Sequence, residues 1–197
     1  MSLTADITTD AERVVRGTVQ GAWNDPKGLP EQVRGALGDQ LRLNAGFSLA
    51  DSLLTLESAR AEAAGLSADA NGTLNLAEKT LDLQAEAQIA ELGSLQPGEA
   101  KVSGAASASA AVSGAFDNFS ATGSATGSNL DLPQLRADRA EFAFELSGLP
   151  RAPVGTLNGH ATIAGERLEL GTRLESDLPR VRLQAFRLET AGNTLSG

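Results

Sequence analysis

Residues 65–89 alternate between apolar and polar side chains, and this pattern constrains the fold more than any other feature of the chain. Successive side chains of a β-strand point to opposite faces of a sheet, so the alternation predicts strands with one apolar and one polar face. A reversal at Glu78–Lys79 would let apolar residues meet across a hairpin, as burial of one face requires. The expected pairs are Leu76 with Leu81, Leu74 with Leu83, and Ala70 with Ala87.

Four further reversals repeat this pattern, and they are expected at Asp51–Ser52, Asp117–Asn118, Gly165–Glu166 and Gly192–Asn193. The apolar pairs expected around the first three are Leu49 with Leu54, Phe47 with Leu56, Phe116 with Phe119, Gly114 with Ala121, Ile163 with Leu168, and Ala161 with Leu170. Gly165 suits the first position of a type II′ turn. The loops at Asp51–Ser52 and Glu78–Lys79 lack the residues that tight turns favour, so a length that differs by two residues stays open at both. Five reversals that obey one rule predict an antiparallel meander.

The remaining segments complete an all-β fold of roughly a dozen strands of about 6–12 residues. Further strands are expected at residues 3–8, 14–23, 141–146 and 181–185, and the last of these ends in a disturbed segment at 186–188. One short helix is expected near residues 29–41, where apolar side chains recur at every fourth position from Val33 to Leu41. Two glycines inside this segment weaken the helix, so it would need support from the rest of the fold.

The size of the expected sheet predicts its shape. Twelve strands at a spacing of about 4.8 Å would span roughly 55 Å, and open twisted sheets of that size curl, split or close. We therefore expect an elongated, strongly curved antiparallel meander that forms an open β-groove with an apolar interior, with the short helix over one edge or the mouth. Residues 193–197 begin another expected strand and then end. For that reason we expect residues 1–197 to be a single β-groove segment and a fragment of a larger protein.

Composition argues against several classes of function. The 16 Lys and Arg against 25 Asp and Glu give a formal net charge of -9, which argues against binding nucleic acid or anionic lipid surfaces through charge. The absence of cysteine rules out disulfides and thiolate metal sites. Aromatic residues make up only 4% of the chain, fewer than a compact core filled with bulky rings would contain. No run of about 18 apolar residues is present, so we expect no membrane-spanning helix.

No cluster of residues in the sequence predicts a catalytic, metal-binding or phosphate-binding site. His160 is the only histidine, and one imidazole without partners makes neither a metal site nor a catalytic site. The expected hairpin register places His160 on the polar face, opposite Gly171. Carboxylates such as Glu141 and Glu145 have the spacing of a solvated strand face, and the segment 123–128 lacks the Lys-Ser/Thr of a phosphate loop. We therefore expect no catalytic residue, no cofactor and no metal.

The apolar face is the remaining functional candidate. A sheet with such a face must fold on itself, pack on a partner or hold an apolar ligand. Lipid acyl chains fit the third option because they need apolar area and no hydrogen-bonding groups, although the pattern alone favours an ordinary core equally. Small residues on both faces from 102 to 127 would either widen a groove or let its opposite wall approach closely. The residues expected to line the groove are Leu49, Leu54, Leu66, Leu74, Leu76, Leu81, Leu83, Ile89, Phe142, Phe144, Leu157, Ile163, Leu168 and Leu170.

Three segments resemble sequences of the TamB/AsmA-like proteins of diderm bacteria, namely residues 72–83, residues 29–38 followed by 41–43, and residues 188–197. The first two carry Leu-x-Leu hairpin motifs and the third a closing Gly-Asn-x-Leu-Ser-Gly, and a Gly-x-Leu-x-Gly motif occurs at residues 155–159. The resemblance implies a non-enzymatic β-taco with an apolar interior, located in the periplasm within a full-length protein anchored in the inner membrane. It implies an outer-membrane partner of the Omp85 type, similar to TamA, contacted through other parts of that protein. The implied function is carriage of phospholipid between the two membranes, or support of outer-membrane protein assembly, as part of a translocation and assembly module.

Other interpretations stay open at the level of sequence. One is a surface adhesin or autotransporter-like β scaffold whose apolar face serves only as a core. Another is a groove that guides unfolded outer-membrane strands by edge pairing, which requires an exposed edge strand able to accept one. A carbohydrate-active enzyme is the least favoured, because no aromatic platform or isolated pair of carboxylates is evident.

Overall fold

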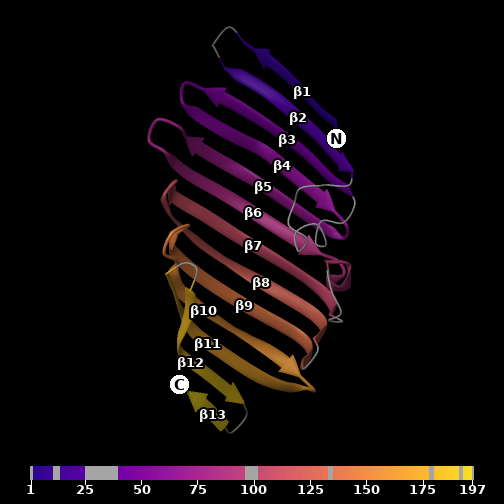
Figure 1. Cartoon of the computed structure of the whole chain (residues 1–197), viewed down its shortest axis with the longest axis vertical. Coiled ribbons are helices and arrows are strands. Elements are labelled where there is room, and N and C mark those ends of the chain that lie inside the picture. Colours follow the sequence, from indigo (N-terminus) through magenta and orange to yellow (C-terminus); the bar gives the residue numbers. More distant parts are fainter. Residues whose placement is uncertain are drawn as a thin grey trace.

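The computed structural model describes residues 2–10, 14–24, 40–95, 102–132, 135–177, 180–190 and 193–196. These residues form thirteen β-strands in one sheet, and the strands follow one another in the sheet in the order of the sequence (Figure 1). The strands are β1 Ser2–Thr9, β2 Val15–Asn24, β3 Gln40–Ala50, β4 Leu53–Ala63, β5 Leu66–Asn75, β6 Thr80–Ile89, β7 Ser103–Ala115, β8 Asn118–Leu132, β9 Leu135–Leu149, β10 Val154–Ile163, β11 Glu166–Asp177, β12 Arg180–Thr190 and β13 Asn193–Ser196. The predicted all-β antiparallel meander is confirmed.

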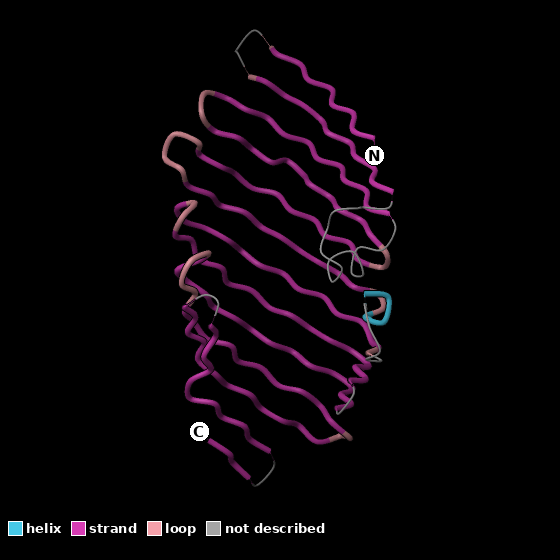
Figure 2. Tube along the Cα trace, viewed as in Figure 1, coloured by secondary structure: helices cyan, strands magenta, loops and turns pink. Residues whose placement is uncertain are grey.

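The sheet is elongated and open, with β1 and β13 as its two edges (Figure 1). Every extensive contact between strands joins sequence neighbours, so the described part of the chain is a single layer. The helical element in this part is the short 3-10 helix η1, Leu92–Leu95, which lies between β6 and β7 (Figure 2). The helix predicted near residues 29–41 falls outside the described residues except at Gln40 and Leu41. There the prediction is wrong, because Leu41 is a β3 residue paired with Trp23 and Ala63.

Beside its turn, the hairpin between β3 and β4 has the predicted register, with Leu49 paired to Leu54 and Phe47 to Leu56, and from Gly46 onward the pairing shifts by one residue. In three other hairpins the predicted register is wrong, and the observed partner lies two residues earlier in the chain. The observed pairs are Leu74 with Leu81, Gly114 with Phe119, and Ala161 with Leu168. Because side chains alternate with a period of two, a shift of two residues keeps every strand residue on its predicted face.

Local hydrogen bonding explains the shift between β5 and β6. The side-chain oxygen of Asn75 accepts hydrogen bonds from the backbone N–H groups of Ala77 at 3.1 Å and Glu78 at 3.0 Å. Lys79 completes the reversal with a positive φ of 56°. Asparagine side chains favour such turns because they replace a backbone acceptor. Residues 76–79 therefore form a four-residue loop, and the strands pair from Asn75 with Thr80 onward.

The other two shifted turns also have local causes. Ala164 and Gly165 both have a positive φ, 51° and 81°, as a type I′ turn requires, so the turn precedes the predicted Gly165–Glu166 by one residue. Between β7 and β8 the turn is formed by Phe116 and Asp117. The Phe116 N–H donates to the carbonyl of Lys79 at 2.8 Å, which ties this turn to the neighbouring loop and places Phe116 outside the paired strands.

Bulges or similar irregularities interrupt five of the ladders, β3–β4, β4–β5, β7–β8, β8–β9 and β11–β12. A reversal was predicted at Gly192–Asn193, but Asn193 is the first residue of β13 and pairs with Thr190, and Gly192 lies outside the described residues. The disturbance predicted at 186–188 occurs at 185–186, which are the extra residues of a bulge opposite Thr172. A similar irregularity interrupts β3–β4 pairing beside Gly46. Bulges bend a strand and increase its twist, so they contribute to the twisted and curved form of the sheet (Figure 1).

The sheet has almost no conventional core. Among the described residues, the buried apolar ones are Ala121, Ala137 and Ala140, and the buried polar one is Thr172. A single layer leaves its apolar face without a covering layer, so most of the large apolar residues on that face are only half-buried. The predicted apolar interior is therefore an open face in this part of the chain.

Candidate functional site

Cross-strand pairing produces one continuous apolar face, since directly paired residues project to the same side of a sheet. Thirteen of the fourteen predicted groove-lining residues lie on this face and are half-buried. They are Leu49, Leu54, Leu66, Leu74, Leu81, Leu83, Ile89, Phe142, Phe144, Leu157, Ile163, Leu168 and Leu170. Leu76 is the exception, because it belongs to the loop 76–79 and is 47% exposed. The predicted pairing of Leu76 with Leu81 is therefore wrong.

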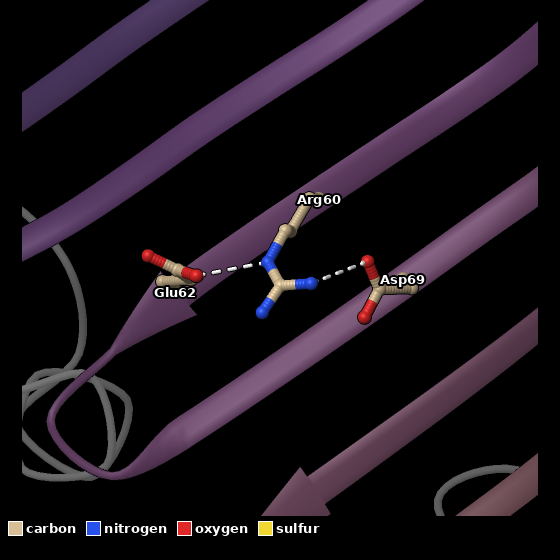
Figure 3. A network of polar contacts seen from close by, with 3 residues as sticks. All are labelled: Arg60, Glu62 and Asp69. Atoms are coloured by element: carbon tan, nitrogen blue, oxygen red, sulfur yellow. Dashed lines mark hydrogen bonds and ion pairs between the residues drawn. The ribbon is translucent and has the colours of Figure 1, made fainter.

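The opposite face of the sheet is polar and solvated. Same-strand Arg-x-Glu pairs recur on it at Arg60–Glu62 (2.8 Å), Arg139–Glu141 (2.5 Å) and Arg167–Glu169 (3.2 Å). Figure 3 shows Arg60 between Glu62 of its own strand and Asp69 of β5, whose carboxylate lies 3.5 Å away. The hydrogen bond to Glu62, followed by the charges of Asp69 and Glu62, raises the pKa of Arg60 above its ordinary value. All three side chains are exposed, and exposed ion pairs contribute little to stability.

His160 lies on the polar face, as predicted, but between Glu141 and Glu169. The predicted position opposite Gly171 is wrong because the β10–β11 register is shifted. The Nε2 atom of His160 is 3.8 Å from a carboxylate oxygen of Glu141. Across the described ranges, no group of three or more His, Cys, Asp or Glu side chains is arranged to hold a metal ion. The His160 neighbourhood is therefore a charged patch on a solvated face.

Alanine forms the floor at the centre of the apolar face. Two neighbouring cross-strand rows contain only alanine from β4 to β7, and each row joins directly paired residues. The rows are Ala61–Ala68–Ala87–Ala108 and Ala59–Ala70–Ala85–Ala110. A hollow of about 440 Å³ lies over these rows and extends to Val19, Leu43 and Ala45 on β2 and β3. Its walls are almost entirely apolar.

Larger apolar residues flank the alanine rows on both sides. Leu66 pairs with Ile89 beside one row, and Leu83 pairs with Val112 beside the other. An alanine side chain ends at Cβ, whereas leucine and isoleucine extend beyond it. The alanine rows are therefore the floor of a trough, and the flanking residues are its rims. The trough crosses the strands in the direction in which they stack, and the strands stack along the length of the sheet (Figure 1).

Phenylalanine fills the floor beyond β8. Phe142 and Phe144 of β9 continue the two alanine rows. The ring of Phe144 lies over Gly123 of β8, where an added Cβ would be 2.6 Å from the ring Cζ. The ring of Phe142 lies over Gly159 of β10, with 2.5 Å between an added Cβ and the ring Cδ1. Each ring takes the space that a side chain on the neighbouring strand would need, and the hollow ends at β7.

The prediction from sequence identified the large side chains and missed the alanines of the floor. The available indication was the alternation itself, in which alanines such as Ala68 and Ala70 occupy apolar positions. The small residues expected either to widen a groove or to let its walls approach include Ala108 and Ala110, which line the hollow. In that strand they widen it.

A larger hollow, of about 870 Å³, lies on the polar face along the ladder Ser67–Gln88–Ser107–Thr126. The hydroxyls of Ser107 and Thr126 already hydrogen-bond to each other at 2.7 Å. Charged side chains such as Glu62 and Arg139 also border this hollow. Mixed polar walls that are open to solvent are typical of the wetted face of a sheet, so the smaller apolar hollow is the better candidate site.

Comparisons with family models, with curated proteins and with solved structures gave no match to this chain. The stretches of chain that the structure describes include no helix with the length and apolar character to cross a bilayer. Interpretation of the site therefore depends on the geometry of the apolar face and on the resemblance of sequence segments.

Proposed function

We propose that this chain is a non-enzymatic segment of a hydrophobic β-groove that carries lipid acyl chains. One observation carries the proposal: the apolar face is continuous across the sheet, and its predicted lining residues are half-buried because no second layer covers them in the described part. Covering such a face is favourable by about 2.5 kcal/mol for each 100 Å² at roughly 25 cal/mol per Å². An acyl chain supplies that cover without needing a hydrogen-bonding partner.

The cellular setting of the proposal comes from the resemblance to TamB/AsmA-like proteins. We place the groove in the periplasm, within a full-length protein anchored in the inner membrane, where it carries phospholipid between the inner and outer membranes. An Omp85-type outer-membrane protein, similar to TamA, would be contacted through other parts of the full-length protein. Support of outer-membrane protein assembly is a further role that the same resemblance suggests.

A charge beside the floor of the trough tests the proposal. Leu83 borders the alanine rows, and Gln84 is its neighbour on the opposite face of β6. We expect native protein to retain acyl lipids, detected by solvent extraction and mass spectrometry, and to transfer a fluorescent phospholipid between vesicles. Leu83→Asp should lose both properties because an ionised carboxylate beside the floor must stay hydrated. Gln84→Asp adds the same charge to the polar face and should behave like native protein.

Two results would contradict the proposal. If folded Leu83→Asp transferred phospholipid as well as native protein does, the apolar face would have no part in the transfer. Folded native protein that is free of lipid and inactive in transfer would favour the structural β scaffold of an adhesin or autotransporter-like protein. In that alternative the face serves only as a core, yet core side chains are normally buried, and the half-burial of this face supports the groove.

Strand β1 supports a second candidate function, the guidance of unfolded outer-membrane strands by edge pairing. Among the described strands β1 pairs only with β2, and its Leu3 and Ile7 are 63% and 62% exposed. An exposed edge can accept an extended segment through backbone hydrogen bonds. A peptide with alternating apolar residues should then protect β1 amides from hydrogen exchange, and Ile7→Lys should weaken that protection. Unchanged exchange at saturating peptide would exclude this role.

A further inference from the structure

The alanine-floored hollow has two ends. On the N-terminal side it reaches Val19 on β2 and Leu43 on β3. On the C-terminal side it reaches the two alanines of β7 and stops. The next position is Gly123 in one row, where the ring of Phe144 covers it, and Ala125 in the other row, which Phe142 follows on β9. The Phe144 ring therefore closes the row of Gly123 at β8, and on the other side the lining of the hollow ends at β2.

That length corresponds to a long alkyl chain. The hollow crosses six strands, from β2 to β7, and five strand spacings of about 4.8 Å make about 24 Å. A staggered carbon chain advances about 1.25 Å per bond, because C–C bonds of about 1.5 Å meet near the tetrahedral angle. About 24 Å is therefore the extended length of an unbranched chain of about 16–20 carbons.

The width and the chemistry of the hollow favour a single alkyl chain over other apolar ligands. Rows that are two residues apart along a strand are separated by about 7 Å, which leaves room for one zigzag chain in the furrow between them. The walls present almost no polar atoms, so a ligand with polar groups along its length would lose hydrogen bonds to water without replacing them. The volume of about 440 Å³ is that of a small-molecule site.

We propose that the hollow holds one unbranched alkyl chain and that Phe144, with Phe142 beside it, is the stop that limits the chain to about 16–20 carbons. This inference rests on the proposed function, because it assigns a site within the acyl-carrying face. A longer chain has to leave the floor at β8 in the row of Gly123, over which the Phe144 ring stands, or at β9 in the row of Ala125, which Phe142 continues. Phe142 and Phe144 therefore determine specificity for chain length.

A series of saturated fatty acids from about 12 to about 24 carbons tests the stop, since each methylene buried on the floor should raise the affinity about fourfold. Affinity is measured for the folded, delipidated full chain by displacement of a fluorescent fatty acid. In native protein we expect the rise to end at about 16–20 carbons. In Phe144→Ala the floor continues over β8, so the rise should continue for several more carbons.

Phe47→Ala is the matched control. Phe47 also lies over a glycine, since an added Cβ on Gly17 would be 2.7 Å from its Cζ, but it does not line the hollow. This variant should keep the native length limit. Phe144→Leu retains an apolar side chain on β9 and replaces Phe144→Ala if that variant does not fold. Its smaller side chain should give a shorter extension of the length limit.

The possible outcomes separate this inference from the proposed function. If folded native protein binds no fatty acid, both are overturned. If affinity rises steadily to the longest chain, the stop is overturned and an acyl-carrying face still stands. A length limit that is identical in native protein and in the Phe144 variants would remove Phe144 as the stop. An equal change in Phe47→Ala would show that the effect is not specific to the end of the hollow.

Discussion

Two halves of the apolar face have the same alternation of polarity and differ in side-chain volume. From β4 to β7 the two central rows are alanine in every strand, and the surface is hollow. From β8 to β10 one row is Ala125–Phe142–Gly159 and the other is Gly123–Phe144–Leu157, so each contains a glycine beside a phenylalanine. The rings lie over the glycines and fill the space above them. The first half therefore has a low, even floor, and the second half has a filled one.

The difference shows that polarity decides which face a residue occupies, while volume decides whether that face is hollow. A phenyl ring over a cross-strand glycine buries apolar area and covers exposed backbone, which stabilises a strand that glycine would otherwise weaken. Alanine rows have no such cover of their own. The N-terminal half is consequently the part of the face where a ligand has apolar surface left to cover.

The largest effect is expected where the second half has no spare room. In Gly159→Ala the added Cβ would lie 2.2 Å from the carbonyl oxygen of Glu141 and 2.5 Å from Cδ1 of Phe142. Both the backbone and the ring must move, and overpacking of this kind costs about 1–3 kcal/mol or more. We expect a loss of about 3 kcal/mol in the free energy of unfolding, measured in urea.

Gly21→Ala is the control on the same face. Its added Cβ would lie 3.5 Å from Leu3 and 3.7 Å from Leu43, which are ordinary contacts. We expect no loss and a gain of about 0.5 kcal/mol, because alanine restricts the unfolded chain. Equal losses in the two variants would mean that the second half is no tighter than the first.

Filling the hollow should remove the difference between the two halves. Ala85 lies in the floor, and a leucine side chain at this position would project into the hollow. We expect Ala85→Leu to weaken fatty-acid binding at least about tenfold, or about 1.4 kcal/mol, while stability stays level because space is available. Ala111→Leu adds the same volume on the polar face, where Ala111 pairs with Gln84 and Thr122, and should bind normally. Native affinity in Ala85→Leu would contradict the assignment of the floor.

A charge in the loop 76–79 should have much less effect than a charge beside the trough. Leu76 and Leu83 are both among the residues that the sequence predicts to line the groove. Leu76 is exposed in the loop, whereas Leu83 borders the floor. We expect Leu76→Asp to transfer lipid like native protein and to change the unfolding free energy by less than about 0.5 kcal/mol. Loss of transfer in this variant would extend the functional surface into the loop.

The smallest effect is expected on the polar face. The pKa of Arg60 is raised by Glu62 and Asp69, so its pairing contributes to stability below the ordinary arginine pKa and is lost only as pH rises through the raised value. Neutral and mildly alkaline solutions leave the pair intact. Arg60→Gln should therefore unfold thermally within error of native protein, with the same small difference at about pH 7 and at about pH 10. A clear loss of stability would show that this network holds β4 to β5.

Strand positions could be predicted because they depend on local pattern. The strands expected at residues 3–8 and 14–23 correspond to β1 and β2, and beside its turn the hairpin at Asp51–Ser52 has the expected register. Register was wrong where a single local feature decided it. The Asn75 side chain closes a four-residue loop, and Ala164 adopts a positive φ. Neither feature changes the alternation of polarity, so the alternation could not reveal it.

The sequence predicted which face of the sheet carries the candidate site, but it did not predict the alanine floor. Large apolar side chains are visible in the sequence one at a time, and thirteen of the fourteen lie on the expected face. The floor joins residues from different hairpins, since Ala68 and Ala108 belong to one row only through Ala87. To predict that row, one must know the pairing partner of each alanine in every ladder. The turns determine those partners.

Away from bulges such as those beside Gly46 and Thr172, the face that a strand residue occupies was determined by the sequence alone, because alternation with a period of two survives a register shift of two residues. The tertiary structure alone decided that this face is open, that its alanines align across four strands, and that phenylalanine closes the rows at β9. The physical reason is the range of the interactions. A side chain's face depends on its neighbours along one strand, whereas alignment depends on the exact pairing of several successive strands, and openness depends on the absence of a second layer over the described part.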